Sequence, residues 1–226
     1  MRFSVHNNNR RLESSQGRHR SSRNLNVRQE GRAVVRPVAA HRSRSLGRMD
    51  RAGQFSAPET WHEPVEQDNY RCVIEPAGAS YRHVVTEAEI RERISLLPTA
   101  FVSNLQVVQL SRMTRKRGIF PLYGMQWGPN VYLYPLEESL VERYAREPKP
   151  QLRIDSEMYG AVWEETGGIW QLTWTEATIK DFYLNNVLIH EIGHLNDHRN
   201  RSYVDRERYA NWFAIEHGYR ASRGRR

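Results

Sequence analysis

The sequence predicts an α+β domain in which a small, twisted, mixed sheet packs on a helix that carries two histidines. Three observations support this prediction. An H-E-x-x-H motif at residues 190–194 lies in an apolar run whose residues recur at helical spacing. Short segments before it have the composition of strands and are bounded by turn residues. The first 60 residues are instead rich in arginine and serine, which predicts a basic N-terminal arm.

The positive charge of the chain is concentrated in this arm. Residues 1–60 contain 13 arginines, no lysine and four acids, whereas the rest of the chain contains 21 basic and 22 acidic side chains. None of the six tryptophans or eleven tyrosines lies in the arm. Such a segment cannot bury enough apolar surface to offset the entropy that is lost on ordering. We therefore expect a disordered arm over 1–60, a linker over 61–69 and a folded domain over 70–226.

The arginines of the arm suggest a partner with negative charge. Guanidinium groups bind phosphates, and such binding weakens strongly as the salt concentration rises. The arm has almost no aromatic side chains on which bases could stack, so we expect binding of nucleic acid to be nonspecific. An acidic protein partner, or a tail that only increases solubility, is the alternative.

Cysteine content and hydropathy exclude two classes of protein. Cys72 is the only cysteine, which rules out an internal disulfide and fits the reducing conditions of the cytoplasm. No apolar run approaches the roughly 18–20 residues of a membrane span. No secretory signal is recognisable near Met1. We therefore expect a cytoplasmic protein without a membrane partner.

Strands and helices are expected to alternate at the beginning of the domain. Short strands are predicted at 72–74, 105–110 and 130–134. Thr86 and Glu89 have the spacing of a capping box, which predicts a helix that ends before Pro98. Apolar residues of this helix should face inward and arginines outward; they are Ile90, Ile94 and Leu97, and Arg91 and Arg93.

The middle of the domain is expected to contain a loop, a helix and a hairpin. The basic segment 112–117 predicts a solvated loop, with contact to a phosphate or an acidic substrate as the alternative. A helix is predicted at 137–146, before two prolines. Residues 152–163 alternate in polarity, and 169–174 follows a Gly-Gly turn, which predicts a hairpin over 152–174.

Two helices are expected at the end of the chain. Thr175 is suited to cap the first one, which should run through the motif to about His198. A last helix is predicted over 205–217, with Asp205 as its N-cap and Gly218 as its end.

The H-E-x-x-H motif has the residue types of a zinc site. On a helix, His190 and His194 lie one turn apart on nearly the same face, so that both imidazoles can bind one metal ion. Glu191 lies about 100° round the helix from His190, where its carboxylate can reach a metal-bound water. Zinc lowers the pKa of such a water to ~7, and Glu191 would act as the general base. The alternative is a pair of core histidines beside a surface glutamate.

A catalytic zinc site needs a third protein ligand beside an open position. The metzincin pattern is excluded, because it requires glycine and histidine where this chain has Asp197 and Asn200. His198 lies about 12 Å along the axis from His190, too far for one straight helix. A ligand from a second helix is therefore needed. The candidates after the motif are Asp197, His198, Asp205, Glu207, Glu216 and His217.

Residues 207–214, E-R-Y-A-N-W-F-A, together with the motif resemble the gluzincin metallopeptidases. The resemblance is to the ImmA/IrrE-like peptidases among them, in which H-E-x-G-H is followed by E-x-x-A-N-x-F-A. It implies that Glu207 is the third ligand of one zinc ion and that Asn211, one turn further on, hydrogen-bonds a ligand. The implied fold is zincin-like, with an edge strand that pairs with an extended peptide. The hairpin over 152–174 is the nearest candidate for that edge.

The resemblance implies a zinc metalloendopeptidase, which hydrolyses peptide bonds by attack of a zinc-bound water with Glu191 as general base. An oxyanion donor is also expected. The alternative is a nucleic-acid-associated or scaffold protein with a non-proteolytic zinc site. The basic arm favours that alternative, whereas Glu191 argues against it, because a structural site needs no base. The candidate oxyanion donors are Tyr203, Tyr209, His217 and Tyr219.

Overall fold

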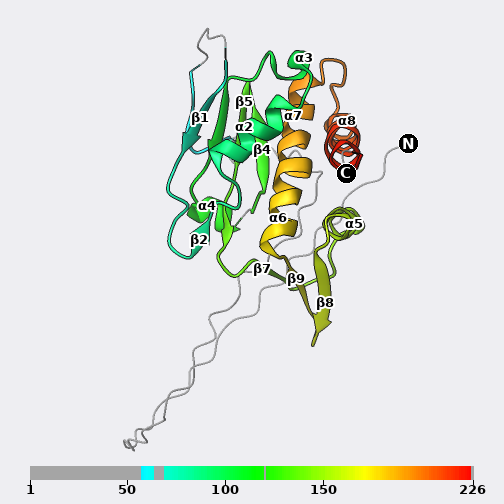
Figure 1. Cartoon of the computed structure of the whole chain (residues 1–226). Coiled ribbons are helices and arrows are strands. Elements are labelled where there is room, and N and C mark those ends of the chain that lie inside the picture. Colours follow the sequence, from blue (N-terminus) through cyan, green and yellow to red (C-terminus); the bar gives the residue numbers. More distant parts are fainter. Residues whose placement is uncertain (1–56, 64–68, 120, 225–226) are drawn as a thin grey trace, which may run out of the picture. The chain divides into compact units, whose positions relative to one another are not determined.

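The computed structural model describes residues 57–63, 69–119 and 121–224, which form a mixed α+β fold (Figure 1). Most of the predicted arm and linker, residues 1–56 and 64–68, lies outside the described residues. Among the described residues, no helix combines the length and the apolar character needed to cross a membrane.

A four-stranded mixed sheet lies at the centre of the domain. Its strands are β1 (Arg71–Ile74), β3 (Val107–Leu110), β5 (Asn130–Leu133) and β4 (Gly124–Trp127), in this order across the sheet. The first three are parallel, and β4 is an antiparallel edge strand. The three predicted strands are confirmed as β1, β3 and β5. β4 was missed, because Gly-Met-Gln-Trp has no β-branched residue and no clear alternation.

The H-E-x-x-H motif lies in the last part of one long helical segment. The segment begins after Thr175, which caps it as predicted, and it contains a π-helical turn in its middle. It ends before Asp197, where the backbone leaves the helical conformation, and so does not reach His198. Its three parts are α6 (Glu176–Phe182), η1 (Tyr183–Val187) and α7 (Leu188–Asn196).

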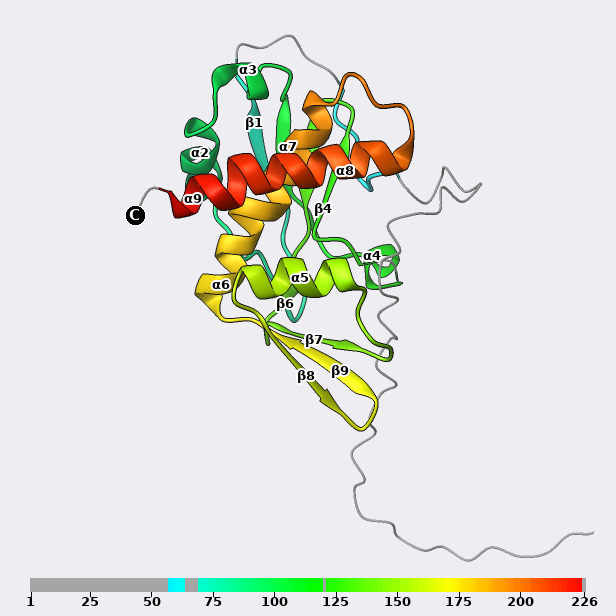
Figure 2. The ribbon, with the colours of Figure 1, turned by 90° about the vertical axis from the view of Figure 1, so that its right-hand side faces the viewer.

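The last helical segment lies across the motif helix (Figure 2). Its parts are α8 (Tyr203–Ala214), the π-helical η2 (Ile215–Arg220) and α9 (Ala221–Arg223). The prediction that Asp205 is the N-cap is wrong. Ser202 is the cap, since its hydroxyl oxygen accepts a hydrogen bond from the Asp205 amide at 3.1 Å. The segment also continues through Gly218, which we expected to end it.

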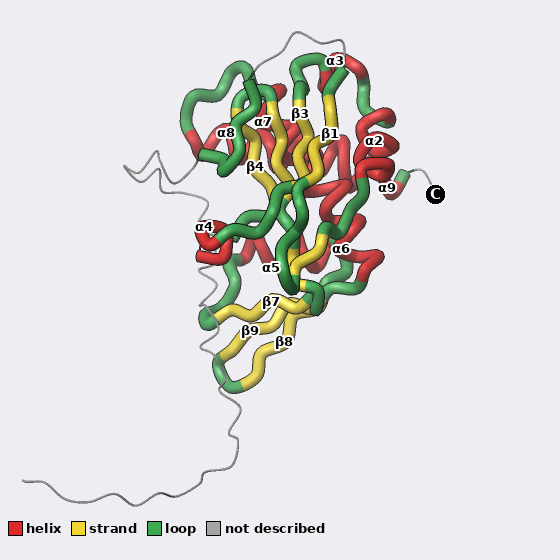
Figure 3. Tube along the Cα trace, turned by 90° about the vertical axis from the view of Figure 1, so that its left-hand side faces the viewer, coloured by secondary structure: helices red, strands yellow, loops and turns green. Residues whose placement is uncertain are grey.

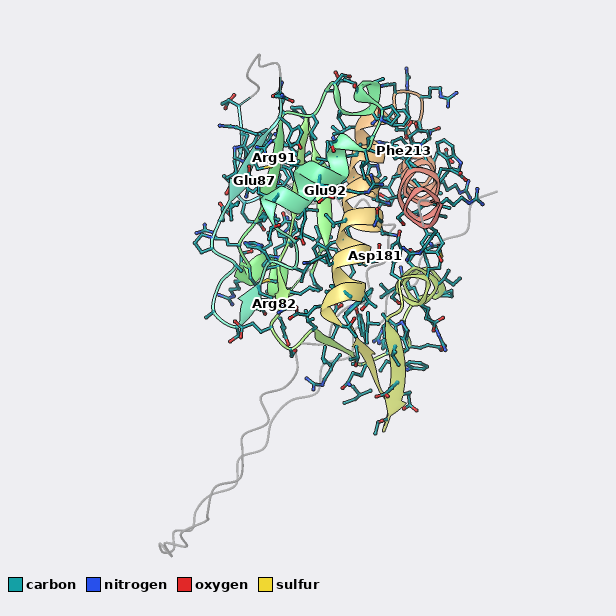
Figure 4. The ribbon with its side chains drawn as sticks, in the orientation of Figure 1. Arg82, Glu87, Arg91, Glu92, Asp181 and Phe213 are labelled. Atoms are coloured by element: carbon teal, nitrogen blue, oxygen red, sulfur yellow. The ribbon has the colours of Figure 1, made fainter. Side chains whose placement is uncertain are left out.

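Two glycines allow these helices to approach each other closely. A Cβ on Gly193 would lie 3.0 Å from Phe213 Cβ, and Phe213 points from α8 toward α7 in Figure 4. A Cβ on Gly218 would overlap the carbonyl oxygen of Asn185 in η1. Gly218 is therefore a contact between two π-helical segments and not a helix end.

Both faces of the central sheet are covered. Side chains alternate between the faces, so that Val108, Leu110, Val131 and Leu133 lie on one face, where they join the core with α7. Figure 3 shows the sheet in front of α7 and α8.

Residues 57–63 cover the opposite face of the sheet. The His62 ring stacks on Tyr132 with the ring centroids 6.1 Å apart, and its Nε2 lies 2.5 Å from Oε1 of Gln109. Trp61 packs edge-on against Trp127 of β4. We expected these residues to belong to the arm and the linker, but they pack on the domain.

An ion pair holds this segment in place. The Arg117 guanidinium lies 2.9 Å from the Glu59 carboxylate, and the Arg117 side chain is only 2% exposed. The hydroxyl group of Tyr134 donates a hydrogen bond to the same carboxylate at 3.2 Å. Arg117 belongs to α4 (Arg115–Ile119). The prediction of a solvated loop is therefore wrong for Arg117, because Glu59 neutralises its charge inside the protein.

Two element predictions in the middle of the domain are wrong. The predicted helix at 137–146 is replaced by β6 (Leu136–Glu137) and β7 (Val141–Tyr144). The first part of the predicted hairpin is a helix, α5 (Pro150–Met158), which begins with proline at its first position. Alternating polarity in so short a segment did not distinguish a strand from a helix.

The rest of the hairpin prediction is confirmed. Gly167 and Gly168 both have positive φ and connect β8 (Val162–Thr166) to β9 (Ile169–Thr173). These strands form a separate antiparallel sheet with β7, in the order β7-β9-β8.

The predicted capping box of Thr86 and Glu89 is confirmed at the start of α2 (Glu87–Ser95). Arg93 of this helix is buried, although we expected it to face outward. Its Nε donates to Asn185 Oδ1 at 2.6 Å, and a second nitrogen donates to the carbonyl of His217.

Two short elements flank α2. The strand β2 (Tyr81–Arg82), which pairs with β6, precedes it, and the helix α3 (Thr99–Val102) follows it.

Candidate metal centre

Donor atoms of His190, His194 and Glu207 meet between α7 and α8. The Nε2 atoms of the two histidines lie 3.1 Å apart. Carboxylate oxygens of Glu207 lie 3.5 Å from His190 Nε2 and 3.4 Å from His194 Nε2. Two ligands of a tetrahedral zinc ion, each about 2.0–2.1 Å from the metal, are separated by about 3.3 Å. The three side chains therefore have the spacing that a shared metal ion requires.

The polar atoms of this group are not satisfied by the protein alone. The three side chains are 15%, 10% and 14% exposed, in the order His190, His194, Glu207. Among the described residues, Glu207 Oε2 and His194 Nδ1 are buried without a hydrogen-bond partner. Burial of an unpaired polar atom costs about 1–3 kcal/mol. A cation at the centre would remove this cost for Glu207, and two imidazoles with one carboxylate are a ligand set of catalytic zinc.

The electrostatics of the group also favour a cation. Burial raises the pKa of Glu207, but interactions with the neighbouring imidazoles of His190 and His194 outweigh this effect and lower the pKa to about 2. Burial lowers the pKa of His190, whereas Glu207 and Glu191 nearby raise it, and the net shift is upward. Carboxylate charge therefore predominates around the imidazole nitrogens, and it would stabilise a positive ion there.

Glu191 lies beside the ligand group and is buried. One of its carboxylate oxygens belongs, with a nitrogen of each histidine, to a group of atoms within 4.8 Å of one another. A Cβ on Gly124 would lie 2.9 Å from Glu191 Oε1 and 2.7 Å from a methyl carbon of Val187. Only glycine fits at this position, and it brings the edge strand β4 directly against Glu191. The hairpin that we expected at this edge forms only as β8 and β9, and these strands lie in the separate three-stranded sheet.

The structure gives other roles to most of the remaining ligand candidates. Asp197 accepts hydrogen bonds from Asn200 and from the backbone of Arg199. Asp205 pairs with Ser202 at the helix cap, and Glu216 forms an ion pair with Arg220.

Asn211 lies on α8 one turn after Glu207 and is half-buried. Among the described residues, no hydrogen bond joins its side chain to the two histidines or to Glu207. Its role as a partner of a metal ligand stays a prediction.

The four candidate oxyanion donors have different surroundings. The His217 ring packs between Phe101 and Phe213, and Tyr219 packs against Tyr159 and Arg223. Tyr209 lies only two residues after Glu207, so it faces away from that side chain, and its ring packs against Trp212 and Phe213. Tyr203 lies one helical turn before Glu207 on the same face of α8, which makes it the best placed of the four.

Asp155 was missed by the sequence analysis. It lies on α5, where burial raises the pKa of its carboxyl, and its charge contributes to the raised pKa of His190. Gln151 donates a hydrogen bond to it at 2.8 Å. The sequence held no signal for this residue, because the segment was predicted to be a strand.

The fold and the site together define a candidate metal centre with two imidazoles, one carboxylate and an adjacent buried glutamate. No protein-family model, no curated protein and no solved structure matches the chain. The chain's own residues and their geometry therefore indicate what this site can do.

Proposed function

We propose that the protein is a zinc-dependent metallopeptidase of the gluzincin type, in which His190, His194 and Glu207 hold one zinc ion. The observation that carries this proposal is the convergence of their donor atoms at 3.1–3.5 Å beside Glu191. The resemblance of the two helix sequences to the ImmA/IrrE-like peptidases supports the same set of residues.

Glu191 is the general base of the proposed reaction. A bound zinc ion would lower the pKa of water and polarise a peptide carbonyl. Glu191 accepts the proton from the attacking water and passes it to the leaving amine. Burial of its carboxylate strengthens its electrostatic interactions with the reacting groups.

An extended peptide is the substrate that the neighbouring strand favours. β4 is an edge strand, and among the described residues no strand pairs with its outer side. A peptide that added to this edge would form main-chain hydrogen bonds with β4. Because Gly124 of β4 adjoins Glu191, a carbonyl of that peptide would lie next to the general base.

Replacement of Glu191 by glutamine tests the proposal. The change keeps the size of the side chain but removes the base, so the variant should retain one zinc ion per chain and lose nearly all cleavage of a peptide library. Glu92→Gln on the exposed face of α2 is the matched control and should behave as the parent (Figure 4). Undiminished cleavage by Glu191→Gln, or a parent protein that binds no zinc, would exclude the proposed mechanism.

A further inference from the structure

Arg206 precedes Glu207 on α8 and reaches the edge strand. Its Nη2 donates a hydrogen bond to Oε1 of Gln126 at 3.4 Å. Gln126 lies two residues after Gly124 in β4, so both positions belong to the same face of the strand. Gly124 adjoins Glu191, and Gln126 follows it by about 7 Å along the strand, so Arg206 contacts the same edge strand two residues beyond the general base.

The charge of Arg206 is not neutralised within the described part of the chain. No carboxylate there forms an ion pair with it, and Gln126 is a neutral, distant partner. Asp197 is the acid whose pKa responds to Arg206, but burial and its hydrogen bonds with Asn200 and Arg199 have the larger effects. A guanidinium has five N–H donors. Most N–H donors of the Arg206 guanidinium are therefore available to a ligand.

We propose that Arg206 is a specificity-determining residue, which binds a carboxylate of the substrate close to the bond that is cleaved. This inference rests on the proposed peptidase function. A planar guanidinium binds a carboxylate through two parallel hydrogen bonds, and the Gln126 amide holds it beside the edge strand. The substrate class is thus a peptide with negative charge near the scissile bond. An acidic side chain and a free C-terminal carboxylate both supply this group.

Arg208 provides a matched control on the same helix. Its side chain is 76% exposed, and its guanidinium already pairs with Asp205 at 3.3 Å. Replacement of Arg208 by glutamine removes the same charge from α8 but leaves Arg206 and β4 unchanged.

The test begins with cleavage of a random octapeptide library by the zinc-loaded parent. The best-cleaved sequence is then made in four forms, with glutamate or glutamine beside the scissile bond and with a free or amidated C-terminus. Affinities of the four labelled peptides are measured on Glu191→Gln, which binds without cleaving. This comparison separates the two sources of the carboxylate.

When Arg206→Gln is combined with Glu191→Gln, binding of the preferred charged peptide should weaken about 10- to 100-fold. The neutral, amidated peptide should bind almost as before, and zinc content should not change. Arg206→Glu should favour a peptide with lysine at that position, and Arg208→Gln should have no effect. Equal weakening for all four peptides, or a parent that cleaves without preference for negative charge, overturns the inference alone. A parent that cleaves no peptide overturns the proposed function as well.

Discussion

At the scale of single residues, Glu207 is the acid that the structure brings to the two histidines of the motif. It approaches them from a separate helix, which the motif helix could not provide with its own residues. The grouping of His190, Glu191 and His194 could be predicted from their spacing in the sequence. The position of Glu207 beside them could not be predicted, because it depends on how α8 crosses α7.

Replacement of Glu207 by glutamine should weaken zinc binding by ~10–100-fold or more, because a neutral amide replaces the anionic ligand. Competition with a chromogenic chelator measures this affinity. Addition of zinc should also raise the unfolding temperature of this variant less than that of the parent. At a given zinc concentration, the ion stabilises the folded state less when its affinity is lower. Asp205→Asn is the control, because this acid pairs with Ser202. Parent-like zinc binding by Glu207→Gln would contradict the proposed ligand set.

A second residue, Glu59, should matter for stability although it lies outside the motif region. Glu59→Gln leaves the buried Arg117 charge without its counter-charge, and we expect a loss of about 1–3 kcal/mol in the free energy of unfolding. Glu157→Gln removes an exposed pair with Arg153 and should cost at most about 0.5 kcal/mol. Denaturant titrations measure both. Equal losses in the two variants would show that the Glu59 contact contributes little.

The Glu59 contact should also depend on pH. Burial raises the pKa of Glu59, but the charge and hydrogen bond of Arg117 outweigh it and lower the pKa in the folded state. A lowered pKa gives stability that is complete above the ordinary value of about 4.3 and is lost as pH falls through the folded value. The difference in unfolding free energy between the parent and Glu59→Gln should therefore shrink below about pH 4. A constant difference over this range would contradict a lowered pKa of Glu59 in the folded protein.

At the scale of elements, close contact between helices determines the position of Glu207, the proposed third ligand. Gly193→Ala places a Cβ 3.0 Å from Phe213 and 3.1 Å from the backbone of Ala210. We expect a loss of about 1–3 kcal/mol through overpacking and weaker zinc binding, because α8 must move away with Glu207. Gly118→Ala is the control, since among the described residues beyond its own helix no atom lies within 4 Å of the added Cβ. Calorimetry measures the loss of stability, and zinc titration measures the affinity for zinc. A loss of stability with unchanged zinc affinity would show that the packing defect does not reach Glu207.

Elements with strong local signals were predictable from the sequence. Thr86 and Thr175 cap their helices through side-chain hydrogen bonds that involve only neighbouring residues. β7 and α5 were predicted wrongly, because sheet pairing and packing against distant residues determine them. β4 was missed for the same reason. Its Gly124 fits the close contact with Val187 and Glu191, but glycine is not a residue that strand propensity favours.

At the scale of the whole molecule, the folded domain includes a segment that the composition assigned to the arm and linker. We predict that removal of residues 1–56 leaves the unfolding temperature nearly unchanged, because this segment has a composition that provides little apolar surface. Removal of residues 1–63 should lower it clearly, since the contacts of Glu59, Trp61 and His62 are lost. Thermal unfolding of both truncated proteins measures the difference. Equal unfolding temperatures would show that residues 57–63 do not stabilise the domain.

The arm also carries the predicted affinity for negatively charged partners. We expect the protein without residues 1–56 to lose salt-dependent binding to single- or double-stranded DNA of any sequence. A filter-binding series over a range of salt concentrations measures this, and retained binding would locate the affinity in the domain.

The ion pair of Glu59 with Arg117 fixes the point at which the basic N-terminal part of the sequence joins the domain. A chain of the 56 residues before the described segment could span at most about 3.3–3.6 Å per residue. This maximum total reach is several times the length of any helix in the domain. We predict that an acidic partner bound by the arginines would be confined near the domain, so that its next encounter with Glu191 would be intramolecular. Local concentration, and not a tight fit at the centre, would govern how often such a partner reaches Glu191.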